Sequence, residues 1–134
     1  MSSTYEPLYV QFLYLFNVER DYYECHEVLE ELWLERGRPL VYQGLLQAAV
    51  ALYHYNKGNL AGARKLLRAA KDKLEAYPNQ TLGIDLHKLV RDCEDEWIRI
   101  EKGAGGEEIA GNAAEPITIR ILDPNLEALV HKLG

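Results

Sequence analysis

His26 and Glu30 are the two side chains of this sequence whose types and spacing best suit chemistry. They lie four positions apart within the segment Y-Y-E-C-H-E-V-L-E-E-L-W, residues 22–33, and residues four apart share one face of a helix. An imidazole and a carboxylate placed in this way can hold one divalent ion or act as an acid–base pair. The spacing predicts a site, although it specifies no reaction and no catalytic residue.

The surroundings of this pair distinguish it from the other charged residues of the segment. At about 100° per residue, the segment separates into a solvated arc and an apolar arc. The solvated arc consists of Glu24, Glu27, Glu31 and Glu35, and the apolar arc of Cys25, Val28, Leu29 and Leu32. The pair lies between these arcs and is bordered by Tyr23 and Trp33. We interpret both aromatics as core and pocket wall, because aromatics at helical spacing usually bury surface area.

A neighbouring segment, 40–57, offers further polar side chains to the pair. It is apolar nearly all round, which is typical of a buried helix. The exception is a stripe of Gln43, Gln47 and His54, which lie within about 40° of one another on the wheel. The connection between the two helices is short and makes them antiparallel neighbours. We predict that the stripe faces the histidine–glutamate pair, because polar groups on a buried helix require partners.

Two interpretations of this cluster follow from the residues. In the first, the cluster binds a divalent metal ion or a small ligand. The metal ligands are then His26, Glu30 and His54, and the ligand-binding residues are Tyr23, Trp33, Gln43 and Gln47. In the second, the polar groups satisfy one another as a buried structural network, and the protein is a non-enzymatic interaction or scaffold module.

Length and composition exclude several classes of function. The chain has 134 residues and a formal net charge of −6, which fits one globular domain and argues against a nucleic-acid partner. Its most apolar window, 45–55, is too short to cross a bilayer, and the N-terminus lacks the features of a signal peptide. Cys25 and Cys93 fall on apolar helix faces without C-x-x-C spacing, which indicates reduced core thiols. We expect a cytoplasmic protein with no membrane partner.

Apolar periodicity and capping signals predict an all-α fold, a compact bundle of about five helices over residues 1–102. The helices begin at Pro7, run over 22–36 and 40–57, and follow the expected N-caps Asn59 and Asp85. A weak internal repeat relates R-D-Y-Y-E-C to G-N-L-A-G-A. This arrangement in helical hairpins is distantly similar to tetratricopeptide repeats.

The C-terminal part of the chain has a different pattern. Residues 103–116 are rich in Gly, Ala and Glu and are typical of a flexible linker. Ile117, Ile119 and Ile121 then alternate with polar residues, as in an extended segment, and Asp123 precedes a short last helix. We expect residues 117–134 to pack on the bundle or on a second subunit, which would make the protein a homodimer, because a free tail would expose an apolar edge.

Three stretches carry a resemblance to a known family. These are F-N-V-E-R-D-Y-Y-E-C-H-E-V-L-E-E-L-W, G-L-L-Q-A-A-V-A-L-Y-H and G-N-L-A-G-A. Together they resemble domain-of-unknown-function family 309, whose hallmark H-x-x-x-E-x-x-W/Y is present as His26, Glu30 and Trp33. The resemblance implies a small all-α protein and a candidate site at this motif, for which metal binding has been suggested. It implies no reaction, because the family has no established activity.

Overall fold

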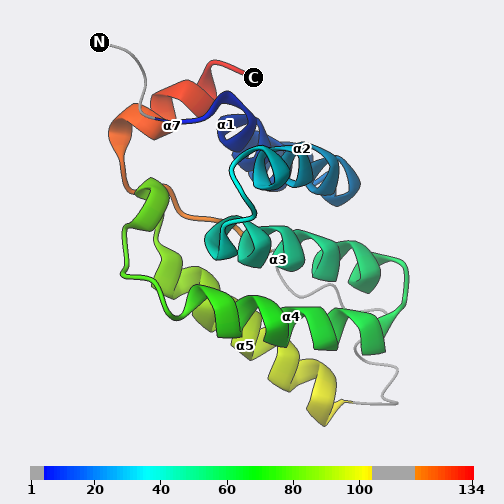
Figure 1. Cartoon of the computed structure of the whole chain (residues 1–134). Helices are drawn as coiled ribbons and strands as arrows, with labels where there is room; N and C mark the ends of the chain where they lie inside the picture. The colour runs from blue at the N-terminus through cyan, green and yellow to red at the C-terminus, as the bar shows by residue number, and fades with distance from the viewer. Residues whose placement is uncertain (1–4, 104–116) are drawn as a thin grey trace.

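Helices account for most of the computed structural model, which describes residues 5–103 and 117–134 (Figure 1). In chain order the elements are α1 (Pro7–Tyr14), the π-helical turn η1 (Leu15–Glu19), α2 (Tyr22–Glu35), α3 (Leu40–Asn56), α4 (Leu60–Leu74), the 3-10 turn η2 (Thr81–Gly83), α5 (Leu86–Lys102) and α7 (Pro124–His131). The described residues contain no strand, only an isolated antiparallel bridge between Ile84 and Ile121. The predicted all-α bundle is confirmed.

Side-chain caps begin four of these helices. Asp21, Asn59, Asp85 and Asp123 each accept a hydrogen bond from a backbone N–H in the first turn of the helix that follows. Such caps satisfy donors that have no partner within the helix. The three caps predicted from the sequence, at Asn59, Asp85 and Asp123, therefore begin helices as expected.

The centre of the bundle is α3, which lies between α2 and α4 in Figure 1. Its chain direction is opposite to that of α2, so the two form an antiparallel hairpin. Gly44 allows α3 to approach α4 closely, because a Cβ at this position would lie 2.7 Å from Cδ2 of Leu74.

The C-terminal segment lies against the first helices of the bundle. Ile117 and Ile119 are buried, and the Asn17 side chain bonds the backbone of Ile119 twice, donating to its oxygen at 2.8 Å and accepting from its nitrogen at 2.9 Å. Arg20 donates to the oxygen of Ile117, and α7 packs against α1. Four apolar residues of the segment are thus buried within one chain, Ile117, Ile119, Leu126 and Val130, whereas Leu133 is 48% exposed. The homodimer stays a prediction. The predicted linker, apart from Gly103, lies outside the described residues.

Both cysteines are inert components of the core. Cys25 and Cys93 are buried free thiols, and burial raises the pKa of each to about 12. Since the thiolate is the reactive form, neither thiol is an activated nucleophile or a metal ligand in the folded protein. None of the described helices has the length and apolar character needed to cross a membrane.

Candidate functional site

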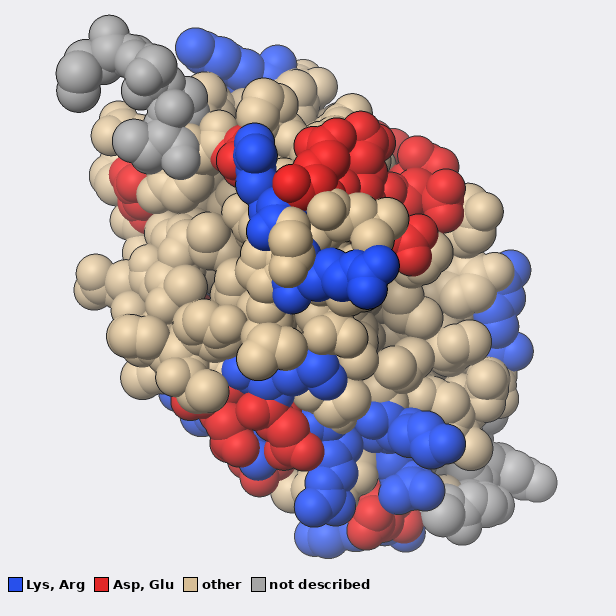
Figure 2. All heavy atoms as spheres, viewed as in Figure 1, with Lys and Arg blue, Asp and Glu red and all other residues tan. Residues whose placement is uncertain are grey.

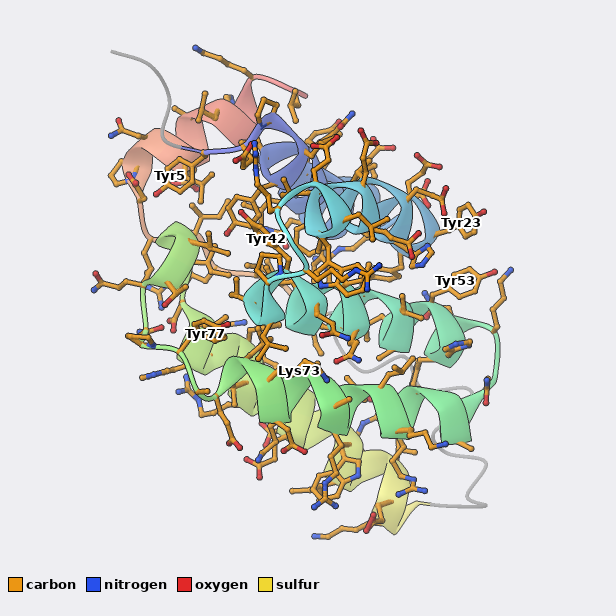
Figure 3. The ribbon with its side chains drawn as sticks, viewed as in Figure 1. Tyr5, Tyr23, Tyr42, Tyr53, Lys73 and Tyr77 are labelled. Atoms are coloured by element: carbon orange, nitrogen blue, oxygen red, sulfur yellow. The ribbon has the colours of Figure 1, made fainter. Side chains whose placement is uncertain are left out.

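A cavity of about 160 Å³ lies between the first turns of α2 and the last turns of α3. Three tyrosines, two histidines and one valine form its lining: Tyr22, Tyr23, His26, Val50, Tyr53 and His54. Figure 3 shows Tyr23 and Tyr53 close together at the same end of the two helices, and their ring centroids are 6.0 Å apart. The antiparallel hairpin therefore brings His26, the one histidine of α2, and His54, the one histidine of α3, to one cavity.

His26 lies between two carboxylates of its own helix. Its Nδ1 is 3.2 Å from Oε2 of Glu27, and its Nε2 is 3.8 Å from Oε2 of Glu30. The three side chains offer ligand atoms that all lie within 4.8 Å of one another. Glutamates dominate the exposed face of α2, as the acidic surface in Figure 2 shows. The imidazole of His26 is therefore surrounded by a strongly negative surface.

His54 is oriented by the cap of the following helix. The Oδ1 atom of Asn59 accepts the N–H of Gly62 at 3.0 Å, and Nδ2 of Asn59 is 3.3 Å from Nδ1 of His54. Gly62 leaves the room for this amide, because a Cβ there would lie 2.6 Å from Nδ2 of Asn59. One asparagine thus links the start of α4 to the histidine at the end of α3.

The structure separates the other predicted site residues from the cavity. Gln43, Gln47 and Trp33 are not among its lining residues. Gln43 and His54 lie about three helical turns apart, roughly 16 Å along α3 at a rise of about 1.5 Å per residue. Residues that share a face of a helix can therefore lie at different heights. That His26 and Glu30 face Gln43 and Gln47 stays a prediction, and the structure places only His54 of the stripe in the lining of the cavity with His26. Trp33 lies roughly 10 Å further along α2 for the same reason.

The polar atoms outside the cavity do not form the expected network either. Among the described residues, Oε1 of Gln47 and Nε1 of Trp33 are buried without a hydrogen-bond partner. Trp33 instead packs beside the guanidinium of Arg38, 5.6 Å from its ring centroid. The side chains of His26 and Glu30 are 34% and 44% exposed. The cluster is therefore half-exposed, and the alternative of a buried network does not describe it.

Some residues of the site were not predicted from the sequence. Glu27 was assigned to the solvated arc, yet its carboxylate reaches back to His26. Tyr22, Val50 and Tyr53 were not among the predicted site residues, but they form walls of the cavity. Their sequence positions gave one indication of this role. Tyr22 is next to Tyr23, Tyr53 is next to His54, and Val50 lies four residues before His54. The two other histidines of the chain, His87 and His131, are exposed and lie outside the site.

The fold and the cluster define a small helical-hairpin bundle with a histidine–carboxylate group at one end of its central hairpin. Residues 9–66 match the model of the family described as "Domain of unknown function (DUF309)", so this segment of the chain is similar to that family. The match contains both histidines of the cavity, and it confirms the resemblance seen in the sequence.

Two relatives extend the comparison beyond this segment. The chain is 37% identical over 102 residues to "Uncharacterized protein YpuF" of Bacillus subtilis, a match covering 72% of this chain and 59% of that protein. It is 32% identical over 72 residues to an "Uncharacterized protein" of Aquifex aeolicus, which covers 52% of this chain and 22% of that protein. The chain thus spans about three fifths and one fifth of these relatives. No solved structure matches it.

Proposed function

We propose that this protein binds a divalent metal ion through His26 and Glu30 at the edge of the cavity, with Glu27 orienting the imidazole. The observation that carries the proposal is the convergence of one imidazole and two carboxylates within 4.8 Å beside a cavity. The same chain has two free thiols, both buried in the core. That state suits a reducing compartment, and we place the protein in the cytoplasm.

The position of Glu27 determines which nitrogen of His26 can bind an ion. A carboxylate only accepts hydrogen bonds, so the contact of 3.2 Å requires the proton of the imidazole on Nδ1. The lone pair of the neutral ring then lies on Nε2, on the side of Glu30. Metal-bound histidines commonly donate their second N–H to a carboxylate in this way, which fixes the ring and makes it a better ligand.

The distance between the two ligand atoms also suits a shared ion. Two atoms bound at about 2.1 Å in tetrahedral geometry lie roughly 3.4 Å apart. The Nε2 of His26 and the Oε2 of Glu30 are 3.8 Å apart, so a small rotation of the exposed Glu30 side chain suffices. A nitrogen–oxygen pair of ligands suits zinc, manganese or nickel. With two protein ligands, the ion would keep open positions and act as a Lewis acid.

The test is a zinc titration by calorimetry of the full chain, purified without an affinity tag or chelator. We expect one ion per chain and loss of measurable binding in His26→Ala. Glu27→Gln should weaken binding by about 10- to 100-fold, the usual cost of losing an orienting carboxylate. His87→Ala, which removes an exposed histidine of α5, is the matched control and should bind as the parent does. Equal zinc binding by the parent and His26→Ala, or none by either, would refute the proposal.

A protein-interaction module is the second candidate, and a separate surface favours it. Leu34 and Leu40 are 51% and 55% exposed and flank the connection between α2 and α3. Exposed leucines on both sides of one turn are suited to contact a partner. In this case partner binding should survive a His26→Ala, Glu30→Ala double change and be lost in a Leu34→Ser, Leu40→Ser double change. The opposite pattern would exclude this candidate.

A further inference from the structure

Residues 117–122 form no helix and run as an open trace in Figure 1, and the bundle binds them by their backbone. The Asn17 side chain accepts the N–H of Ile119 at 2.9 Å and donates to the oxygen of the same residue at 2.8 Å. A side-chain amide that accepts and donates in this way reproduces the hydrogen bonds of a neighbouring β-strand. Arg20 donates to the oxygen of Ile117. The turn η1 and the residue after it therefore hold one edge of this segment.

The start of α5 holds the other edge of the same segment. Nζ of Lys88 donates to the oxygen of Thr118 at 2.9 Å, and the N–H of Asp85 donates to the oxygen of Arg120 at 2.8 Å. The carbonyls bound by α5 alternate along the segment with those bound from η1. Such alternation is the arrangement of an extended chain that is held at both edges.

Four residues make these contacts, and we call them the backbone clamp: Asn17, Arg20, Asp85 and Lys88. All four belong to residues 5–103, so a second copy of the chain could supply residues 117–122 to them. Side chains of the segment add selectivity, since Ile117 and Ile119 are 8% and 1% exposed. Recognition of a backbone together with alternate apolar side chains is the chemistry of β-strand addition. No clamp residue lines the cavity or belongs to the His26 cluster, so this inference is independent of the metal site.

Chain connectivity permits a clamp filled by its own chain and a clamp filled by a second copy. Lys88 and Lys102 lie roughly 21 Å apart along α5, at a rise of about 1.5 Å per residue. A stretch as long as residues 104–116 spans at most roughly 47 Å, so it can return to its own clamp or reach a neighbouring one. A segment tethered by a short linker acts at an effective concentration on the order of millimolar. The parent should therefore be mainly monomeric at micromolar concentration and exchange segments as millimolar concentration is approached.

We propose that the backbone clamp is a peptide-binding site that accepts residues 117–122 of a second copy of this chain. Two copies then exchange their C-terminal segments, and each bundle binds the segment of the other through the contacts that it makes with its own. Such an exchange is a low-cost route to a dimer. The partner copy supplies Ile117 and Ile119 to the core, so each bundle of the dimer is completed by the other chain.

An engineered disulfide tests the exchange in full-length chains. Ile84 and Ile121 form an antiparallel bridge, and residues paired in this way have Cα atoms about 4.5–5.5 Å apart, which a disulfide can join. One chain carries Ile84→Cys and a second chain carries Ile121→Cys. The two are unfolded in urea, refolded together at about 1 mM and oxidised. We expect a covalent heterodimer joined at these two positions, located by mass spectrometry, because only an exchanged segment can form that bond.

Three controls make this result specific. One chain with both substitutions should form the disulfide within itself at micromolar concentration, which verifies the geometry. Leu133→Cys, at an exposed position of the same C-terminal part, should not bond to the Ile84→Cys chain. Asn17→Leu, added to the Ile84→Cys chain, removes both hydrogen bonds of the amide and should lower the yield of heterodimer by about tenfold or more.

A complementation experiment tests the same proposal without a disulfide. Asn17→Leu weakens the clamp and leaves the segment intact, whereas Ile119→Asp weakens the segment and leaves the clamp intact. Circular dichroism checks that each variant keeps its helices. By light scattering, each variant alone should be monomeric, and their mixture should contain a heterodimer in which the intact segment binds the intact clamp.

The outcomes decide whether the clamp takes a second copy. Absence of a heterodimer in both experiments refutes the proposal. A heterodimer that persists when both chains carry Asn17→Leu also refutes it, because the contact then lies elsewhere. A free peptide with the sequence of residues 117–122 should bind the Ile119→Asp chain. Binding of this peptide without any heterodimer would refute the second copy as the ligand and leave the clamp as a site for a segment of another protein.

Discussion

The two interfaces of α3 are built from side chains of opposite size. Towards α4, Gly44 brings the helices so close that an added Cβ would lie 2.7 Å from Leu74. Towards the start of α2, Tyr53 meets Tyr23 with ring centroids 6.0 Å apart, and the cavity lies beside these rings. Small residues therefore close one interface completely, whereas large aromatic residues leave space in the other. The cavity of this bundle thus lies at a helix end that is lined by aromatic side chains.

The largest expected change in the free energy of unfolding comes from shortening a side chain in the tighter interface. It tests whether the two interfaces differ in packing. Leu74 is fully buried against Gly44, so Leu74→Ala should lower the free energy of unfolding by about 2–5 kcal/mol. Val50 is half-buried and already borders the cavity. Val50→Ala should therefore cost less than about 1.5 kcal/mol. Urea unfolding of both variants measures the difference, and similar losses in the two variants would mean that the interfaces are equally tight.

Metal binding should stabilise the interface that contains the cavity. A ligand that binds only the folded chain adds about 2.7 kcal/mol to the free energy of unfolding at 100 times its dissociation constant. Thermal unfolding with and without zinc should show this gain in the parent and in Leu74→Ala, because Leu74 lies in the other interface. His26→Ala should show none. Zinc stabilisation of His26→Ala would assign the ion to another part of the chain.

Adding side-chain volume should lower the free energy of unfolding by different amounts on the two sides of α3. Gly44→Val places side-chain atoms where Leu74 lies and should cost about 1–3 kcal/mol. Val50→Ile adds one methylene group towards the cavity and should change the free energy of unfolding by less than about 0.5 kcal/mol. Destabilisation by Val50→Ile as large as that by Gly44→Val would show that the cavity has no free volume.

The smallest effects concern chemical reactivity at two adjacent residues of α2. Cys25 is buried and its pKa is raised to about 12, so its thiolate is scarce at pH 8. His26, the next residue, is 34% exposed. Iodoacetamide should therefore leave the folded chain unmodified at pH 8, whereas diethyl pyrocarbonate should modify His26, and bound zinc should slow that modification. Mass spectrometry locates the products, and rapid alkylation of Cys25 would contradict its burial.

Most of the fold could be predicted from local signals in the sequence. The caps Asn59, Asp85 and Asp123 act through the nearest few residues, so they can be predicted without the structure. The polar break after α1 was also visible. Its form, a π-helical turn followed by Arg20 at a φ of 55°, was not, because it depends on contacts with the C-terminal segment.

The site could be predicted only in part. Helical periodicity gives the direction of a side chain around the axis, and this was enough to bring His54 and His26 to one cavity. It gives no height along the axis, so it could not show that Gln43, Gln47 and Trp33 lie outside the lining of that cavity. The reach of Glu27 back to His26 depends on a side-chain rotamer. The rotamer of a side chain and its height along the helix axis relative to a neighbouring helix both depend on packing. The pattern of residues in the sequence does not specify that packing.

Anomalous diffraction at the zinc edge from crystals of the zinc-loaded chain tests the central claim most directly. The account predicts one strong peak about 2.0–2.2 Å from Nε2 of His26 and from a carboxylate oxygen of Glu30. Glu27 should remain on Nδ1 of His26, and His54 should remain unbound to the ion, with Asn59 on its Nδ1. A peak bonded to His54, a peak elsewhere on the chain, or no peak at all would contradict it.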